Sequence, residues 1–146
     1  MKNIEPKYIW EEDVGTATVI LQDDKGHIFK GCAFCHPADI DMISEKTGLQ
    51  IAECRAVNKY LTHVRDNEIK PALAALTEYL GAIQHTPGIP KRAKGILYHR
   101  INALEADLEL ISKSIKDNKK YIHNYITDKE KFYQKIRKNR NQDKVE

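Results

Sequence analysis

Cys32, Cys35 and His36 match the C-x-x-C-H pattern through which haem is attached covalently to proteins. A haem protein of this kind needs an oxidising compartment, and the first fifteen residues hold no apolar run of the sort that a secretory signal carries. Residues 27–35 are β-rich, and side chains alternate between two faces along a strand. Cys32 and Cys35 lie an odd number of positions apart. We therefore expect them to point apart and to share neither a porphyrin nor a metal ion.

Other catalytic and metal-binding patterns are also absent from the sequence. Three cysteines are a sparse, odd count that suits a reducing compartment, and His36 and His63 do not fall at zinc-finger spacing. The histidines are scattered, and there is no G-x-S-x-G, Walker or dinucleotide-binding motif. Asp39 and Asp41 lie two apart in a turn, where carboxylates more often cap a helix than perform acid–base chemistry. We expect no enzyme, no metal, no cofactor and inert thiols.

A basic loop is the strongest candidate for binding. Residues 85–95 hold two glycines and two prolines, and they deliver Lys91, Arg92 and Lys94 into the first turn of a helix. Cations are unfavourable there because a helix N-terminus already carries partial positive charge and free N–H groups. A bound phosphate would resolve the conflict. The alternative is that these cations pair with carboxylates of the first helix or of a neighbouring subunit.

A second basic pair lies earlier in the chain. Arg55 and Lys59 are one turn apart on a predicted helix. They could complete a basic pocket if the hairpin and the helix start face the loop of another subunit. The alternative is a salt bridge of Arg55 with Glu53, Asp39 or Asp41.

Three further side chains could contact a nucleotide base. Tyr98 could stack on a base and Asn102, one turn later, could hydrogen-bond its edge, although both are also ordinary helix residues. Phe34, near the end of the second predicted strand, could serve as a stacking ring. Packing in the core is the simpler expectation for Phe34.

The elements that must position these residues begin with a hairpin. Residues 14–22 and 27–35 are β-rich, and Asp23-Asp24-Lys25-Gly26 separates them as a turn. An isolated hairpin is marginal in water, so it must pack on the helices or on another copy of itself. Thr47 and Gln50 form a capping box at the start of a helix, with Ser44 as an alternative cap.

Two long helical segments follow the hairpin. The first covers residues 44–84, and Pro71 predicts a kink or break near residues 67–70. The second covers 90–140, about 75 Å at 1.5 Å per residue. Its apolar positions keep a four-three alternation, with polar interruptions at Asn118 and Lys129. This seam consists of Leu97, Ile101, Leu104, Leu108, Ile111, Ile115, Asn118, Ile122, Tyr125, Lys129, Phe132 and Ile136.

The length of this seam predicts the architecture. A compact domain of this size has a radius of gyration of about 15 Å, so the molecule must be elongated. We predict a single α+β domain over residues 1–146, with an antiparallel hairpin or small sheet followed by two long helices. One shorter helix cannot cover the whole seam, so we expect a homo-oligomer, dimer or hexamer, with coiled-coil-like packing. Asn118 would help to fix the register between subunits.

The net charge of +3 conceals an asymmetry. Residues 112–146 hold eleven Lys or Arg against five Asp or Glu, whereas the rest of the chain is net acidic. This basic segment could bind nucleic acid, but Asp117, Asp128 and Glu130 interrupt it, which favours a solvated helix face. No stretch approaches the roughly 18 apolar residues of a membrane span.

The order of these motifs resembles a known family. The strand ends G-x-A-x-C-x-P-x-D (Gly31 to Asp39), and the helix begins T-G-x-x-I-A-x-x-R-A (Thr47 to Ala56), before two long helices. Over residues 14–95 this pattern is similar to the first Thoeris anti-defence family of bacteriophages. The resemblance implies a helix-rich oligomer in the cytoplasm of an infected bacterium. It would sequester a cyclic ADP-ribose-type signal, or a cyclic oligonucleotide, between protomers without cleaving it.

The resemblance also implies that the pocket uses the loop between the helices and the start of the second helix. Two other functions remain open. One is a phage-type nucleic-acid-binding accessory protein that uses the basic C-terminal helix. The other is a structural coiled-coil adaptor.

Overall fold

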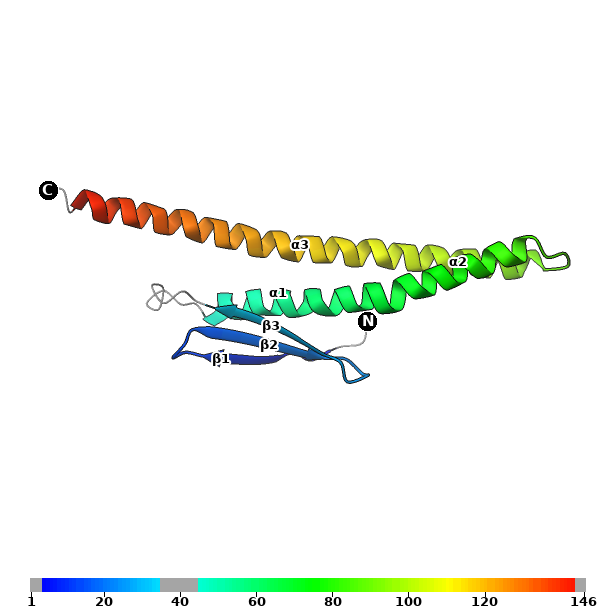
Figure 1. The fold of residues 1–146 in the computed structure, drawn as a ribbon, viewed down its shortest axis with the longest axis horizontal. Helices are drawn as coiled ribbons and strands as arrows, with labels where there is room; N and C mark the ends of the chain where they lie inside the picture. The colour runs from blue at the N-terminus through cyan, green and yellow to red at the C-terminus, as the bar shows by residue number, and fades with distance from the viewer. Residues whose placement is uncertain (1–3, 35–44, 144–146) are drawn as a thin grey trace.

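A three-stranded sheet opens the chain. The computed structural model describes residues 4–34 and 45–143, with side chains up to Ile126. Strands β1 (Lys7–Glu11), β2 (Thr16–Gln22) and β3 (Ile28–Phe34) form an antiparallel sheet in the order β1-β2-β3 (Figure 1). The predicted hairpin corresponds to β2 and β3. Strand β1 was not predicted, and it joins β2 through a tight turn at Gly15, whose φ is +61°.

One face of the sheet packs on helix α1 (Glu45–Val64). Alternate residues of β2 and β3 supply this face because strand side chains alternate. The buried residues are Ala17, Val19, Leu21, Phe29 and Ala33 from the sheet, and Ile51, Ala52 and Ala56 from α1. Small residues at this interface let the helix backbone approach the strands closely.

The first helical segment is continuous from residue 45 to 84. After α1 come a π-helical turn, η2 (Arg65–Ile69), and helix α2 (Lys70–Gln84). The predicted irregularity is therefore a π turn and not a break, with Pro71 just after it. Thr47 lies inside the first turn of α1, so the predicted capping box at Thr47 is wrong, and Ser44 lies outside the described residues.

The π turn coincides with a change in apolar spacing. On the face that meets α3 (Lys91–Asp143), successive apolar residues are three or four positions apart. The exception is the step from Val64 to Ile69, which is five positions. A π turn absorbs one extra residue in a helix. It therefore keeps the apolar residues of α1 and α2 on one side.

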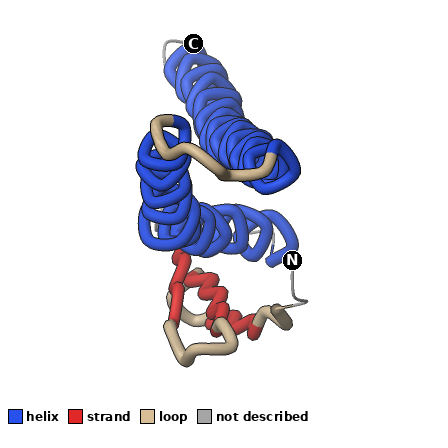
Figure 2. Tube along the Cα trace, turned by 90° about the vertical axis from the view of Figure 1, so that its right-hand side faces the viewer, coloured by secondary structure: helices blue, strands red, loops and turns tan. Residues whose placement is uncertain are grey.

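Helix α3 (Lys91–Asp143) has 53 residues, and its described length confirms the predicted second helix. At 1.5 Å per residue it is about 80 Å long. A short loop with Gly88 at a φ of +86° reverses the chain. Helix α3 then runs back along α2 and α1, so that α1 lies between the sheet and α3 (Figures 1 and 2). No described helix is long and apolar enough to cross a membrane.

The interior of the described chain consists of three clusters along this length, and Val57 and Tyr60 pack against both of the first two. The first joins the sheet to α1 and reaches Ile122 and Tyr125 of α3. The second joins α1 and η2 to the middle of α3, and its buried residues are Leu61, Ile69, Ile111 and Ile115. The third joins α2 to the start of α3 through Leu80, Ile83 and Ile101.

The seam of α3 therefore has partners within its own chain. Its positions from Leu97 to Tyr125 belong to or pack against the three clusters, apart from Asn118. Asn118 donates from Nδ2 to Asn58 Oδ1 at 2.8 Å, so it pairs with α1 of the same chain and not across subunits as predicted. The side chains of Lys129, Phe132 and Ile136 lie outside the described residues. The homo-oligomer stays a prediction that rests on this last part of α3.

Candidate functional site

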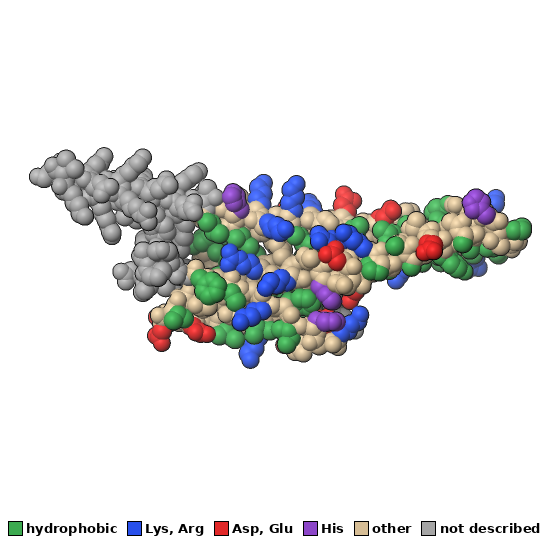
Figure 3. All heavy atoms as spheres, in the orientation of Figure 1, with side chains coloured by type: hydrophobic (Ala, Val, Ile, Leu, Met, Phe, Trp, Pro, Cys, Tyr) green, Lys and Arg blue, Asp and Glu red, His purple; other side chains and the backbone are tan. Residues whose placement is uncertain are grey.

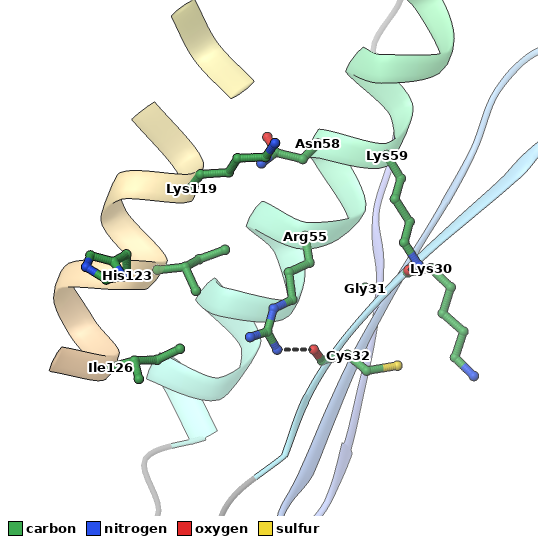
Figure 4. Close-up of a pocket in the computed structure, with 10 residues that line it drawn as sticks. Lys30, Gly31, Cys32, Arg55, Asn58, Lys59, Lys119, His123 and Ile126 are labelled. Atoms are coloured by element: carbon green, nitrogen blue, oxygen red, sulfur yellow. Dashed lines mark hydrogen bonds between the residues drawn. The ribbon is translucent and has the colours of Figure 1, made fainter. Parts of the chain in front are cut away.

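A basic groove lies where α1, α3 and the edge of the sheet meet. Its volume is about 690 Å³ (Figure 4). Two of the predicted binding residues, Arg55 and Lys59, line it. The described residues that line it are Lys30, Gly31, Cys32, Arg55, Asn58, Lys59, Lys119, Ile122, His123 and Ile126.

Arg55 and Lys59 are held by the backbone of β3. Arg55 Nη1 donates to the carbonyl oxygen of Cys32 at 2.6 Å, and Lys59 Nζ donates to that of Lys30 at 2.7 Å. Strand β3 is at the sheet edge, where carbonyl groups lack a neighbouring strand. The two cations therefore cover the edge, and one N–H of Arg55 is committed to it. A guanidinium has five N–H donors, so Arg55 retains others for a ligand.

Gly31 brings β3 against α1 at the groove. A Cβ atom at this position would overlap the backbone oxygen of Ala52 and lie 2.5 Å from the backbone nitrogen of Ala56. Only glycine fits so close an approach of strand and helix. The side chains of its neighbours Lys30 and Cys32 point away from the groove (Figure 4).

Helix α3 provides the opposite wall. Lys119 and Asn58 extend toward one another across the space between α3 and α1, and Ile126 points toward α1 (Figure 4). Asn58 is fixed by two hydrogen bonds: it accepts from Asn118 and donates to the carbonyl oxygen of Ile115 at 3.3 Å. The register of α3 against α1 is therefore set next to the groove.

The groove is positively charged. Its lining includes Arg55, Lys59 and Lys119, and none of the described residues that line it is an Asp or Glu. None of these three cations forms a salt bridge with a described carboxylate. Lys and Arg side chains also gather over the sheet, α1 and α3 on the face shown in Figure 3.

The structure does not support the alternative prediction that Arg55 forms a salt bridge with Glu53. Burial raises the pKa of Tyr8, and the neighbouring charge of Glu53 and a hydrogen bond to its carboxylate raise it further. Glu53 is therefore directed toward the first strand. Asp39 and Asp41, the other predicted partners, lie outside the described residues.

The basic loop lies at the far end of the molecule. Lys91 and Arg92 are exposed and Lys94 is half-buried at the start of α3. Lys119 follows Lys94 by 25 residues, roughly 38 Å along the helix, so one chain cannot bring the loop to its own groove. The structure thus separates the two predicted basic groups.

The predicted base-contacting residues do not join the groove either. The Tyr98 hydroxyl accepts a hydrogen bond from Gln84 Nε2 at 2.7 Å, which ties α3 to α2, and Asn102 is exposed. Phe34 is 76% exposed, so the expectation that it packs in the core is wrong. As an alternate residue of β3 it lies on the sheet face away from α1.

The cysteines show no shared site within the described residues. Cys32 Sγ lies 3.9 Å from Thr18 Oγ1 on the outer face of the sheet. Cys35 and His36 lie outside the described residues, so their orientation stays a prediction. Burial raises the pKa of the Cys54 thiol and the charge of Glu53 adds to the effect, which keeps this thiol protonated.

Sequence reasoning missed the α3 wall of the groove. Lys119, Ile122, His123 and Ile126 recur at three- and four-residue spacing, which places them on one helix face. That spacing identifies a face but not the neighbour that it meets. Comparisons with known protein families, with curated proteins and with solved structures found no match for this chain.

Proposed function

We propose that the groove binds a phosphate-bearing nucleotide signal and holds it without chemical change. The resemblance of the sequence to the first Thoeris anti-defence family suggests a cyclic ADP-ribose-type molecule or a cyclic oligonucleotide. Sequestration of that signal in the cytoplasm of an infected bacterium would block the defence that it triggers.

The charge of the groove is the observation that carries this proposal. Three cations from two helices border one concave space, and no described residue of its lining is a carboxylate. Charge-assisted hydrogen bonds to phosphate are among the stronger polar contacts in proteins, and the planar guanidinium of Arg55 suits bidentate binding.

The size and the apolar part of the groove also fit a nucleotide. Small-molecule sites have volumes of roughly 300–1,000 Å³ and combine apolar walls with a few polar groups. Ile122 and Ile126 supply the apolar wall here, and the groove volume of about 690 Å³ lies within that range. A ribose or base could pack on the isoleucines while a phosphate contacts Arg55.

Sequestration is favoured over turnover by the composition of the lining. Among the described residues it contains no Ser, Thr, Asp or Glu, so this part of the lining offers neither a hydroxyl nucleophile nor a carboxylate base. The thiol side chain of Cys32 points away from the groove (Figure 4). Of the described residues in the lining, His123 alone has an imidazole.

A second copy of the chain is needed if the basic loop takes part. Within one chain the loop is too far from the groove, whereas Lys91 and Arg92 of another protomer could reach it. The homo-oligomer that we predict for α3 is therefore linked to the family expectation of a pocket between protomers.

The test is to incubate the purified protein with candidate signals, denature it by heat and identify the released molecules by mass spectrometry. A protein that only sequesters its ligand releases it chemically unchanged. In calorimetry we expect Arg55→Ala to weaken binding roughly tenfold to a hundredfold, since it removes a charge-assisted contact. Arg100→Ala, an exposed cation of α3 outside the groove, is the matched control. Unchanged affinity in Arg55→Ala would place the site elsewhere.

Two further outcomes separate the alternatives. Backbone binding to nucleic acid falls steeply with salt in proportion to the phosphate contacts made, whereas a small ligand with one or two phosphates in the groove loses much less. A steep salt dependence with DNA or RNA would favour the accessory-protein function. A structural adaptor would bind neither class of molecule.

A further inference from the structure

The β2–β3 turn and the end of α1 bring together three side chains that the groove does not use. These are Asp23, His27 and His63. One potential ligand atom from each residue lies within 4.8 Å of the others. His63 is 36 residues from His27 in the sequence, which is why spacing alone gave no indication of the cluster.

Asp23 and His27 are fixed by the turn itself. Asp23 Oδ1 accepts hydrogen bonds from the backbone N–H groups of Lys25 at 3.0 Å and His27 at 2.7 Å. Asp23 Oδ2 lies 2.8 Å from His27 Nδ1. The Asp23 side chain is only 7% exposed, so its carboxylate keeps one orientation.

His63 is positioned from both sides. Its ring centroid lies 4.6 Å from that of His27 and 5.3 Å from that of Phe29. Asn67 Nδ2 lies 3.2 Å from His63 Nδ1 and also donates to the His63 carbonyl oxygen at 3.1 Å. A partner on one ring nitrogen orients the imidazole and leaves the other nitrogen for a ligand.

The surroundings of this cluster are acidic. Burial raises the pKa of Tyr60, and the charges of Glu68, Asp23 and Asp24 raise it further. The neighbouring cation Lys25 is paired with Glu68, with Nζ 3.3 Å from Oε1. The negative charges of Asp24 and Glu68 near the cluster favour the binding of a positive ion.

We propose that Asp23, His27 and His63 form a binding site for a divalent transition-metal ion, with Zn²⁺ as the first candidate. Imidazole nitrogen and carboxylate oxygen are ligands that Zn²⁺ prefers, at about 2.0–2.2 Å, which sets neighbouring ligand atoms of a tetrahedron roughly 3.3 Å apart. The Asp23–His27 distance of 2.8 Å is near this value, and a ligand atom of His63, within 4.8 Å of the other two, would move toward them as the metal binds. The proton between Asp23 and His27 leaves when the metal binds.

A hydrogen bond that closes the β2–β3 turn would explain why Asp23 and His27 lie together, but it does not explain the position of His63. The third side chain comes from α1, so a metal ion would tie the hairpin to the helix. His63 lies one turn after Lys59, and the ion would hold β3 against α1 beside the groove. This proposal does not depend on what the groove binds.

The test uses tag-free full-length protein freed of metal by a chelator. Titration with ZnCl₂ in a calorimeter should show one ion per chain, and Co²⁺ should give a visible absorption band from a low-symmetry site. Asp23→Asn and His27→Gln should each weaken Zn²⁺ binding at least tenfold. His27 is exposed, so His27→Gln should leave the fold intact. His63→Gln is a poorer test because it removes a ring that packs on Phe29.

Two control variants make the result specific. His99→Gln changes an exposed histidine of α3 outside the cluster, and Cys32→Ser tests the thiols; both should leave the affinity unchanged. No heat of binding for Zn²⁺, or full affinity in His27→Gln, would overturn the proposal. So would loss of binding in Cys32→Ser, which would assign the ion to the cysteine segment.

Discussion

At the scale of the residue, Gly31 controls the contact between the sheet and α1. An added methyl group meets backbone atoms of Ala52 and Ala56, which cannot move aside as a side chain could. We expect Gly31→Ala to lower the free energy of unfolding by about 3 kcal/mol, the upper end of the usual cost of overpacking. Chemical denaturation measures this loss.

Gly81→Ala is the matched control for this substitution. Gly81 is exposed in α2, and nothing lies near the added methyl group. Alanine is the better helix former, so this variant should gain about 0.5–1 kcal/mol. Equal effects of the two substitutions would contradict the close contact at Gly31.

The hydrogen bond between Asn58 and Asn118 sets the register of α3 against α1. Asn118→Ala leaves the half-buried Asn58 oxygen without its donor, so we expect a loss of about 1 kcal/mol. A double-mutant cycle with Asn58→Ala should give a coupling energy of at least about 0.5 kcal/mol. Strict additivity of the two substitutions would show that the pair does not set the register.

The Asp23 carboxylate makes stability depend on pH. Its burial favours the protonated form, but hydrogen bonds from the His27 side chain and from the N–H groups of His27 and Lys25 hold its pKa below the usual 3.8. A lowered pKa stabilises the fold above the unfolded value, and that stabilisation is lost as pH falls through the folded one. The melting temperature should therefore fall as the pH drops below about 4.

Asp23→Asn tests this assignment because it keeps the acceptor oxygen and removes the charge. The loss of stability below about pH 4 should be shallower in this variant. Asp66, whose pKa is also lowered by its hydrogen bond with Arg65, keeps part of the acid sensitivity. An unchanged slope would assign the acid sensitivity to other carboxylates.

How far the candidate site follows from the sequence differs from residue to residue. Arg55 and Lys59 could be singled out because cations one turn apart share a helix face. Lys119 and Ile126 could not, because their meeting with α1 depends on the Asn58–Asn118 register. Phe34 was misjudged since an aromatic residue in a strand is usually buried, whereas this face of the sheet has no described layer over it.

At the scale of the element, the π turn η2 compensates for one extra residue. Deletion of the exposed Asn67 together with Pro71→Ala should give a regular α-helix that still presents Leu80 and Ile83 to α3. We expect its helicity and melting temperature to stay close to those of the parent. The proline must change as well, because in a regular helix it would cost about 3 kcal/mol.

Deletion of Glu78 is the control for this design. Glu78 is exposed in regular α2, where no turn can absorb the loss. Leu80 and Ile83 would then rotate by about 100° away from Ile101. Circular dichroism and thermal melts compare the two deletions. If the Asn67 variant is as unstable as the Glu78 variant, the π turn has another cause.

The elements themselves could be predicted to different degrees. The long helices follow from apolar periodicity over many turns, and Pro71 located the irregular turn. The strand β1 was missed because Lys7–Glu11 is short and mixes charged with aromatic residues, so only its pairing with β2 makes it a strand.

At the scale of the whole molecule, α3 extends beyond the other helices and strands that the structure describes. Tyr121 donates to Gln50 near the start of α1 at 3.2 Å, and α3 then continues to Asp143. The last 17 residues after Ile126 are roughly 25 Å of helix. Their sequence continues the apolar seam, so we predict that they pair with another copy of the chain.

Sedimentation at micromolar concentration tests this pairing. The full chain should exceed its monomer mass of 16.8 kDa. Phe132→Asp with Ile136→Asp should reduce the mass to that of the monomer and leave the helicity largely unchanged. A monomeric parent protein would disprove the oligomer, and the basic loop could then not serve the groove.

The arrangement of the three apolar clusters has a consequence for how the protein is degraded. The third cluster shares no side chain with the other two, so the α2–α3 end can open without unfolding the sheet or the walls of the groove. Proteolysis under native conditions begins where such openings are most frequent. We expect the first cuts near the exposed loop at Pro87 and Gly88, and the end of the molecule that contains the sheet and the groove should resist the protease longer than the α2–α3 end.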